Sequence, residues 1–109
     1  MASEPDCLFC KLVREGEHVN AGDGFVAIED INAKAPVHLL VLPERHIDTF
    51  RDVHEFESDE AKRMLEFVAD TARKAGLEDY QVVVNVGPGA GQTVFHLHWH
   101  VLGGGRPFE

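Results

Sequence analysis

The feature that most restricts the fold is a run of alternating histidine and apolar residues near the end of the chain, TVFHLHWHVL at 93–102. Alternate side chains of a β-strand point to opposite faces of the sheet, so a strand here places His96, His98 and His100 on one face. The opposite face carries Phe95, Leu97, Trp99 and Val101. Such an apolar face needs a second layer to cover it, which predicts a sheet packed against a helix.

The covering layer is predicted to be a helix from about 58 to 75. Apolar residues recur there near the 3.6-residue period, and Gly76 supplies a stop signal. Ser58 is suited to the N-cap, because its hydroxyl can accept a free N–H group of the first turn. The predicted inward stripe consists of Ala61, Met64, Leu65, Val68, Ala72 and Ala75.

The other elements are shorter. Strands are predicted at 24–30, 37–43 and 80–86, and the glycine-rich turn GPGAGQ at 87–92 is expected to close an antiparallel hairpin. A short helix or turn is expected at 6–17, with Leu8, Leu12 and Val13 inward, and a short helical turn with loop at 46–58. Because strands and helices do not alternate regularly, the prediction is one α+β domain over 1–109.

Composition narrows the partners. The net charge is −9 and the few lysines and arginines are scattered, which argues against a nucleic-acid backbone as the main partner. No apolar run approaches the roughly 20 residues that span a membrane, and the first residues lack the features of a signal peptide. The expectation is a cytoplasmic protein with no membrane partner.

Strand geometry tests a metal-binding interpretation of the three histidines. Neighbouring histidines on one face start about 7 Å apart and the outer two about 13 Å apart. Zinc lies only about 2 Å from each ligand nitrogen. Two neighbours could therefore share an ion, but convergence of all three would be strained, which disfavours a zinc-dependent hydrolase.

A catalytic interpretation suits the same residues better. In a row of imidazoles each disfavours protonation of the next, so the middle ring stays neutral and can attack phosphorus. A neighbouring imidazole can pass a proton to the leaving group. Backbone N–H groups of the turn at 87–92 can bind the phosphate charge. Asn85, Gln92 and Thr93 flank this turn with further donors.

The cysteines Cys7 and Cys10 form a C-x-x-C pair. In a cytoplasmic protein a structural disulfide is disfavoured. Half of a zinc site, a redox pair and two small buried residues all remain open from the spacing alone, because the motif by itself is a weak signal.

Three stretches resemble the histidine triad (HIT) family, and specifically its Hint-like branch of purine nucleoside phosphoramidate hydrolases. They are HLHWHVL, the surrounding VVNVGPGAGQTVFHLHWHVLGG, and the upstream EDINAKAPVHLLVLPERHI. Together they cover nearly the whole chain. The resemblance implies an α+β, HIT-like fold with a five-stranded antiparallel sheet, one main helix and a short N-terminal helix. It also implies a homodimer with one ten-stranded sheet.

The resemblance implies roles position by position. His98 would be the nucleophile that forms a nucleotidyl-histidine, His100 would assist at the phosphate or leaving group, and His38 would orient the histidines by hydrogen bonding. Substrate contacts would come from Asp30 at the ribose, Ile28 and Ile31 at the base, and Asn85, Gly91, Gln92 and Thr93 at the phosphate.

Many bacterial HIT proteins are similar to this chain in having an N-terminal C-x-x-C that binds zinc with two histidines. The resemblance implies such a structural site at Cys7, Cys10, His46 and His96, with zinc not required for catalysis. His18 and His54 are expected to be surface residues.

The implied activity is hydrolysis of the P–N bond in a purine nucleoside 5′-phosphoramidate. The alternatives are a dinucleoside polyphosphate hydrolase, a nucleotidyl transferase, or a nucleotide-binding regulator without turnover. Two departures affect the details. The sequence ends in GGGRPFE where many Hint-like proteins continue into a tail rich in Trp and Pro, and Trp99 is bulkier than the usual residue between the second and third histidines.

Overall fold

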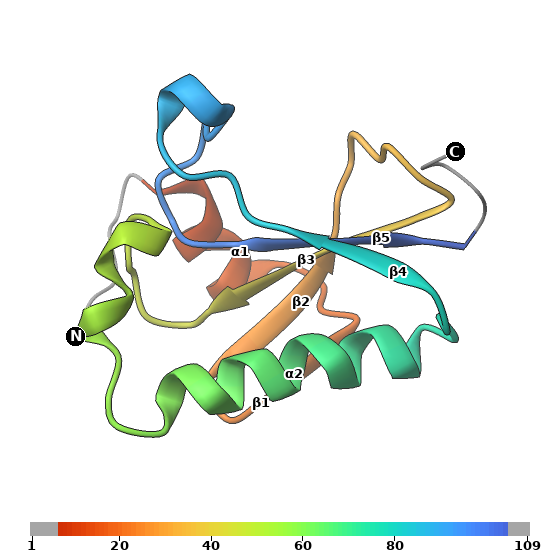
Figure 1. Ribbon diagram of the computed structural model, residues 1–109, viewed down its shortest axis with the longest axis horizontal. Helices are drawn as coiled ribbons and strands as arrows, with labels where there is room; N and C mark the ends of the chain where they lie inside the picture. The colour runs from red at the N-terminus through yellow and green to blue at the C-terminus, as the bar shows by residue number, and fades with distance from the viewer. Residues whose placement is uncertain (1–6, 105–109) are drawn as a thin grey trace.

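The computed structural model describes residues 7–104, and its centre is a five-stranded antiparallel sheet (Figure 1). The strands are β1 (Asn20–Gly22), β2 (Phe25–Glu29), β3 (Val37–Pro43), β4 (Tyr80–Val83) and β5 (Trp99–Gly103). Their order across the sheet is β1-β2-β3-β5-β4, and neighbouring strands run antiparallel. The α+β fold with one main helix and a short N-terminal helix is confirmed.

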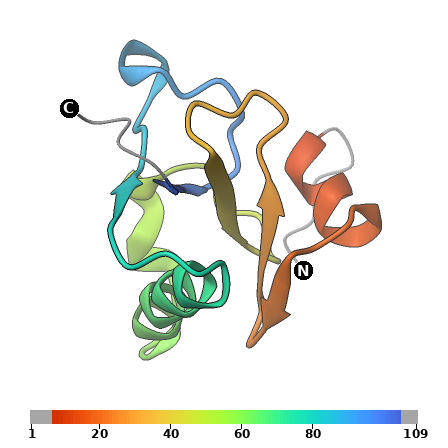
Figure 2. The same cartoon turned by 90° about the vertical axis from the view of Figure 1, so that its right-hand side faces the viewer.

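The two helices cover opposite faces of the sheet. Helix α1 (Leu8–Glu15) and helix α2 (Glu60–Lys74) lie on either side of β2 and β3 (Figure 2). Alternating residues of the two central strands supply two separate apolar clusters. The α2 side holds Phe25, Ala27, Leu39, Val41 and Val101, and the α1 side holds Phe9, Val26, Ile28, Leu40 and Leu42.

Helix α2 packs with a different stripe from the predicted one. Its buried residues are Met64, Phe67, Val68, Thr71 and Ala72. Leu65, predicted inward, is 54% exposed, and Ala75 is also exposed. Met64, Val68 and Ala72 belong to both the predicted and the observed stripe, so the neighbouring positions decide which way the helix faces. Phe67 faces the sheet in place of Leu65, and its ring packs on Phe25.

The N-terminus of α2 also differs from the prediction. The N-cap is Asp59 and not Ser58, and it makes no side-chain capping hydrogen bond. The C-terminus agrees with the sequence, because Gly76 follows with a φ of 80°, in the left-handed region that favours glycine.

The short elements show where periodicity misleads. Strand β1 was not predicted, strand β4 ends at Val83 and not at 86, and β5 begins at Trp99 and not at 93. The turn at 87–92 contains a short 3-10 helix, η2 (Pro88–Ala90), and the predicted turn after β3 contains η1 (Phe50–Glu55). In α1 Phe9 is buried while Leu8, predicted inward, is 53% exposed.

Parts of two expectations fall outside the described range. Asp6 of the expected N-terminal helix and residues 105–109 of the tail GGGRPFE lie there. Within residues 7–104, none of the helices has both the length and the apolar character to cross a membrane.

Candidate functional site

A cleft of about 640 Å³ opens on the α1 side of the sheet. It is in the size range of small-ligand sites. One part of its wall is apolar and comes from Phe9, Leu12, Ile28, Leu40 and Val94; the polar part comes from Asp30, His38, Asn85, Thr93, His98 and His100. The predicted residues Ile31 and Gly91 also line it.

A hydrogen bond to the backbone determines which ring nitrogen of His98 carries the proton. Its Nδ1 lies 2.8 Å from the backbone carbonyl oxygen of His96. A carbonyl can only accept a hydrogen bond, so Nδ1 carries the proton and Nε2 keeps its lone pair. Burial lowers the pKa of His98 below its ordinary value, and the ring is therefore neutral at pH 7 with an unprotonated Nε2.

His100 and His38 form a hydrogen-bonded pair across β3 and β5. The register pairs His100 with Leu40 and His38 with Leu102, so the two imidazoles share the cleft face. The backbone N–H of Lys34 donates to Nδ1 of His38 at 3.0 Å. Neutral His38 therefore carries its proton on Nε2, which donates to Nδ1 of His100 at 2.9 Å.

These two hydrogen bonds, from Lys34 to His38 and from His38 to His100, determine the tautomer of His100. Because its Nδ1 accepts from His38, its proton resides on Nε2, the remaining nitrogen. Burial lowers the pKa of His100 to about 4, and the charges of His98 and His38 act in the same direction. His98 and His100 thus differ: His98 presents a lone pair to the cleft and His100 presents an N–H group.

Asp30 lies directly after β2 and adds a carboxylate to this group. One of its oxygens, Oδ1, accepts the backbone N–H of Asn32 at 2.8 Å. The other, Oδ2, lies 3.3 Å from Nε2 of His38. Ile28, two residues earlier, is buried in the cleft wall, whereas Ile31 is 95% exposed at its rim.

The glycine-rich loop is braced by two amide side chains. Asn85 donates from Nδ2 to the carbonyl oxygen of Ala90 at 2.9 Å. Gln92 is 3% exposed; its oxygen accepts the N–H of Gly87, and its nitrogen donates to the carbonyls of Asp48 and Val94. Gln92 therefore lies behind the loop and holds it, while Asn85, Gly91 and Thr93 line the cleft.

The three histidines do not share one strand face. Residues 93–98 precede β5 and contain bends. His96 contacts Cys7, Cys10 and His46 and, unlike His98 and His100, does not line the cleft. Leu97, Trp99 and Val101 belong to the α2-side cluster as predicted, but Phe95 is 41% exposed. Trp99 donates from Nε1 to Sδ of Met64 on that side, away from the cleft.

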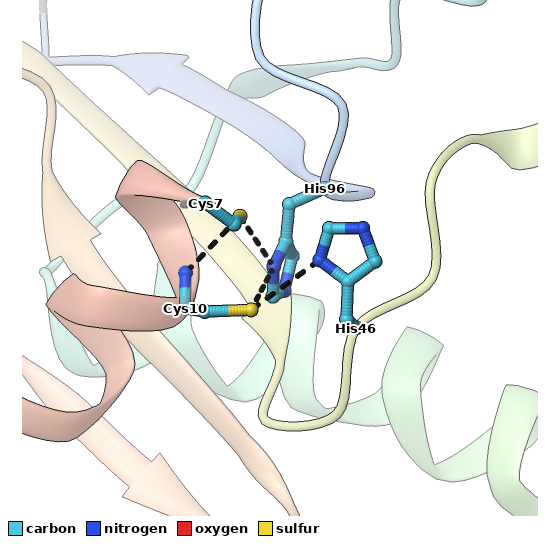
Figure 3. Close-up of side chains that lie close together, drawn as sticks. All are labelled: Cys7, Cys10, His46 and His96. Atoms are coloured by element: carbon cyan, nitrogen blue, oxygen red, sulfur yellow. Dashed lines mark hydrogen bonds between the residues drawn. The ribbon is translucent and has the colours of Figure 1, made fainter. Parts of the chain in front are cut away.

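Cys7, Cys10, His46 and His96 converge on one point (Figure 3). The cysteines come from α1 and its N-cap, His46 from the loop after β3, and His96 from the segment before β5. Nδ1 of His96 lies 3.5 Å from both sulfurs, and Nδ1 of His46 lies 3.3 Å from Sγ of Cys10.

The four donors fit a tetrahedral zinc ion. Zn–S bonds of about 2.3 Å and Zn–N bonds of about 2.0 Å put sulfur and nitrogen ligands about 3.5 Å apart, close to the distances found. The far nitrogens are also engaged as in metal sites: Nε2 of His96 donates to the carbonyl of Pro43 at 2.8 Å, and Nε2 of His46 lies 2.5 Å from Asp48. Burial raises the pKa of the Cys7 thiol and lowers the pKa of His96 to about 4.

The most informative residue that the sequence prediction missed is Phe9. Its ring lies edge-to-face against His98, with ring centroids 4.9 Å apart. The signal was ambiguous, because Phe9, Leu12 and Val13 fit the helical period as well as Leu8, Leu12 and Val13 do. His18 and His54 are exposed as expected.

Comparisons with known proteins identify the family of the chain. Residues 12–106 match the HIT domain model. A HIT-like protein of Chlamydia pneumoniae is 44% identical over 95 residues, which cover 84% of this chain and 83% of the relative.

Two solved structures are similar in fold. A HIT family hydrolase from Legionella pneumophila Philadelphia 1 has a TM-score of 0.84 at 37% identity, covering 93% of this chain and 95% of that one. A histidine triad nucleotide-binding protein from Candida albicans has a TM-score of 0.77 at 25% identity, with coverage of 95% and 85%. The chain belongs to the HIT domain family.

Proposed function

We propose that this protein hydrolyses the P–N bond of purine nucleoside 5′-phosphoramidates through a nucleotidyl-histidine on His98. The observation that supports this most directly is the hydrogen bond from His98 to the carbonyl of His96, which leaves Nε2 with a free lone pair in the cleft. The relatives support it in part, since one is named a hydrolase and another nucleotide-binding.

The first half of the reaction forms the intermediate. Nε2 of His98 attacks phosphorus, a P–N bond to the ring forms, and the P–N bond to the amine breaks. The bound phosphate favours a protonated His100, because a nearby anion stabilises a cation. His100 then passes the proton on its Nε2 to the departing nitrogen.

The second half restores the enzyme. Water attacks phosphorus, its proton goes to Nε2 of His100, and the bond between phosphorus and His98 breaks. The products are the nucleoside monophosphate and the amine, and one water is consumed. In the substrate-free site His38 orients His100 by donating to its Nδ1.

The cleft offers matching contacts for the rest of the substrate. Asp30 would accept hydrogen bonds from the ribose hydroxyls, and Ile28 would contact the base, with the exposed Ile31 beside it at the cleft rim. Asn85, Gly91 and Thr93 border the phosphate. Gln92 contributes through the loop that it braces, and Gly91, with a φ of 94°, allows the backbone to approach the phosphate without a side chain in the way.

Zinc is proposed at Cys7, Cys10, His46 and His96. Four protein ligands close the coordination sphere, so a bound ion would supply structural cross-linking and no open position for water. A bound ion would stabilise the fold by linking α1 and its N-cap to the loops that carry His46 and His96.

The test is turnover of adenosine 5′-phosphoramidate by His98→Ala. We expect AMP release to fall by about 10⁴-fold or more, as is typical when a covalent nucleophile is lost. His54→Ala, a change at an exposed histidine of η1, serves as the control and should keep full activity. Near-normal turnover by His98→Ala would remove the nucleophile assignment.

A substrate panel separates the alternatives. Faster cleavage of diadenosine polyphosphates than of the phosphoramidate would favour the polyphosphate hydrolase, and AMP transfer to phosphate in place of water would favour the transferase. Tight AMP binding without turnover of either substrate would favour a regulator.

A further inference from the structure

Phe9 contacts the nucleophile, and none of the reaction steps above accounts for it. It lies in α1 between Cys7 and Cys10 and is 7% exposed. We propose that Phe9 is a positioning residue that holds the imidazole of His98 with Nε2 directed at the substrate. The catalytic consequence rests on the proposed function, whereas the orientation of the ring can be measured without it.

The contact has the geometry of a specific aromatic pair. The ring planes of Phe9 and His98 meet at 87° with centroids 4.9 Å apart, and Phe9 also lies 6.2 Å from His96 at 66°. Edge-to-face arrangements at such distances are the favoured ones for aromatic rings. Phe9 therefore restrains the direction of the imidazole plane as well as filling space.

His98 needs such a restraint because its backbone lies just before β5. The hydrogen bond from Nδ1 to the His96 carbonyl fixes one ring atom, but a ring held at one atom can pivot about that bond. The two ring contacts of His98 within residues 7–104 are those with Phe9 and with His100, whose centroid is 5.0 Å away.

Phe9 is itself anchored by the cysteines on either side of it. The sulfurs of Cys7 and Cys10 contact the imidazoles of His46 and His96, and the ring packs in the cluster with Val26, Ile28, Leu40 and Leu42. The same helix thus joins the four-residue cluster to the nucleophile. A change in that cluster would reach His98 through Phe9 as well as through the backbone of His96.

Leu12 provides a matched comparison. It lies on the same helix, lines the same cleft and packs against the same cluster as Phe9, but it has no aromatic ring. If Phe9 were only an apolar wall for the base, its loss would raise KM as the loss of Leu12 would. A positioning residue acts on kcat.

The experiment compares Phe9→Leu with Leu12→Ala. The primary measurement is the ¹⁵N NMR spectrum of the His98 imidazole in substrate-free protein, which reports which nitrogen carries the proton. A ring that tilts away from its position misaligns the hydrogen bond from Nδ1 to the His96 carbonyl, and this bond is what fixes the tautomer. Wild type and Leu12→Ala should show the Nδ1-protonated tautomer, and Phe9→Leu a mixture of tautomers. With adenosine 5′-phosphoramidate, kcat of Phe9→Leu should fall about 10- to 100-fold, the range expected for a misplaced reacting group, while KM stays within about threefold.

The outcomes separate this inference from the proposed function. A tautomer mixture in Phe9→Leu supports the positioning role even if wild type fails to turn over the phosphoramidate, which would overturn only the function. An unchanged tautomer together with an unchanged kcat overturns the positioning role even if wild type is active. Phe9→Met, a second apolar replacement without an aromatic ring, is measured in parallel, and unfolding of both Phe9 variants beside a folded Leu12→Ala would also overturn it by assigning Phe9 to the core alone.

Discussion

His100 is the residue whose charge should respond most to the substrate. In the free site burial lowers its pKa to about 4; His98, His38 and Lys34 also lower it, and Asp30 alone among the named charges raises it. A bound phosphate adds a negative charge that favours the protonated ring, and an opposite charge at close range raises a pKa by about 1 to 3. Binding of AMP should therefore be accompanied by proton uptake, and affinity should rise as the pH falls from 8 towards 6.

This linkage can be measured by calorimetry of AMP binding at pH 6.5 in two buffers of different ionisation enthalpy. The buffer-dependent heat gives the number of protons taken up. His100→Asn keeps a polar side chain but has no group that titrates in this range, so its uptake should be smaller than that of wild type. Comparing the two proteins cancels the titration of the AMP phosphate itself. Equal uptake by both would contradict the assignment.

Helix α1 is the element most dependent on its attachments. It has eight residues, and isolated helices shorter than about 12 residues are marginal in water. The cysteine–histidine cluster and Phe9 therefore hold it against the sheet. If zinc occupies the cluster, a strong chelator should speed hydrogen exchange of the α1 amides by about tenfold or more while leaving α2 protected, because opening α1 does not require unfolding the α2-side core.

Helix α2 in the same sample is the internal control for that exchange experiment. Cys10→Ser should reproduce the effect without chelator, and metal analysis of wild type should find about one zinc per chain, the occupancy of a four-ligand site. Unchanged α1 exchange after removal of bound metal would show that packing alone holds the helix.

Elements whose own residues favour their structure could be predicted from the sequence, whereas elements formed through long-range contacts could not. The prediction for strand 37–43 matches its observed bounds, because five of its seven residues are valine or leucine and both faces of the strand are covered. Strand β1, the tripeptide Asn20–Gly22, carries no strand signal and forms by pairing with β2. Polar and apolar residues alternate over the whole stretch 93–102, but only the part from Trp99 onward pairs as a β-strand. Before Trp99 the N–H of Leu97 donates to the carbonyl of Ile47, and His96 contacts the cysteines.

The same distinction applies to the site. The histidines, Asp30 and the cysteines could be named from motifs and a family resemblance, and the structure brings them together. The role of Phe9, the exposure of Ile31 and the buried position of Gln92 depend on long-range packing. Periodicity indicates which side of an element a residue occupies, but it does not indicate which distant side chain it meets.

At the scale of the whole molecule, one edge strand of the sheet, β4, exposes large apolar side chains. Strand β4 lies at the end of the strand order and pairs with β5 alone among the described strands. Tyr80 and Val82 on it are 37% and 41% exposed. An edge strand with unpaired N–H and C=O groups and apolar side chains is a template for pairing with another chain, and two-fold symmetry would let the same edge of two copies pair with each other.

We therefore expect that two copies of the chain pair through β4 as a homodimer, which would extend the five strands to ten. Val82→Lys should convert the protein to a monomer in analytical ultracentrifugation, because a lysine on an edge strand opposes pairing. Val19→Lys is the matched control: Val19 is 48% exposed and directly precedes β1 at the opposite edge, so this variant should remain a dimer. Wild type should sediment at twice the 12.1 kDa chain mass at micromolar concentration. A monomeric wild type would show that the chain forms no such dimer, and a dimer that persists in Val82→Lys would place the interface elsewhere. Either result would leave the exposed apolar residues of β4 without this explanation.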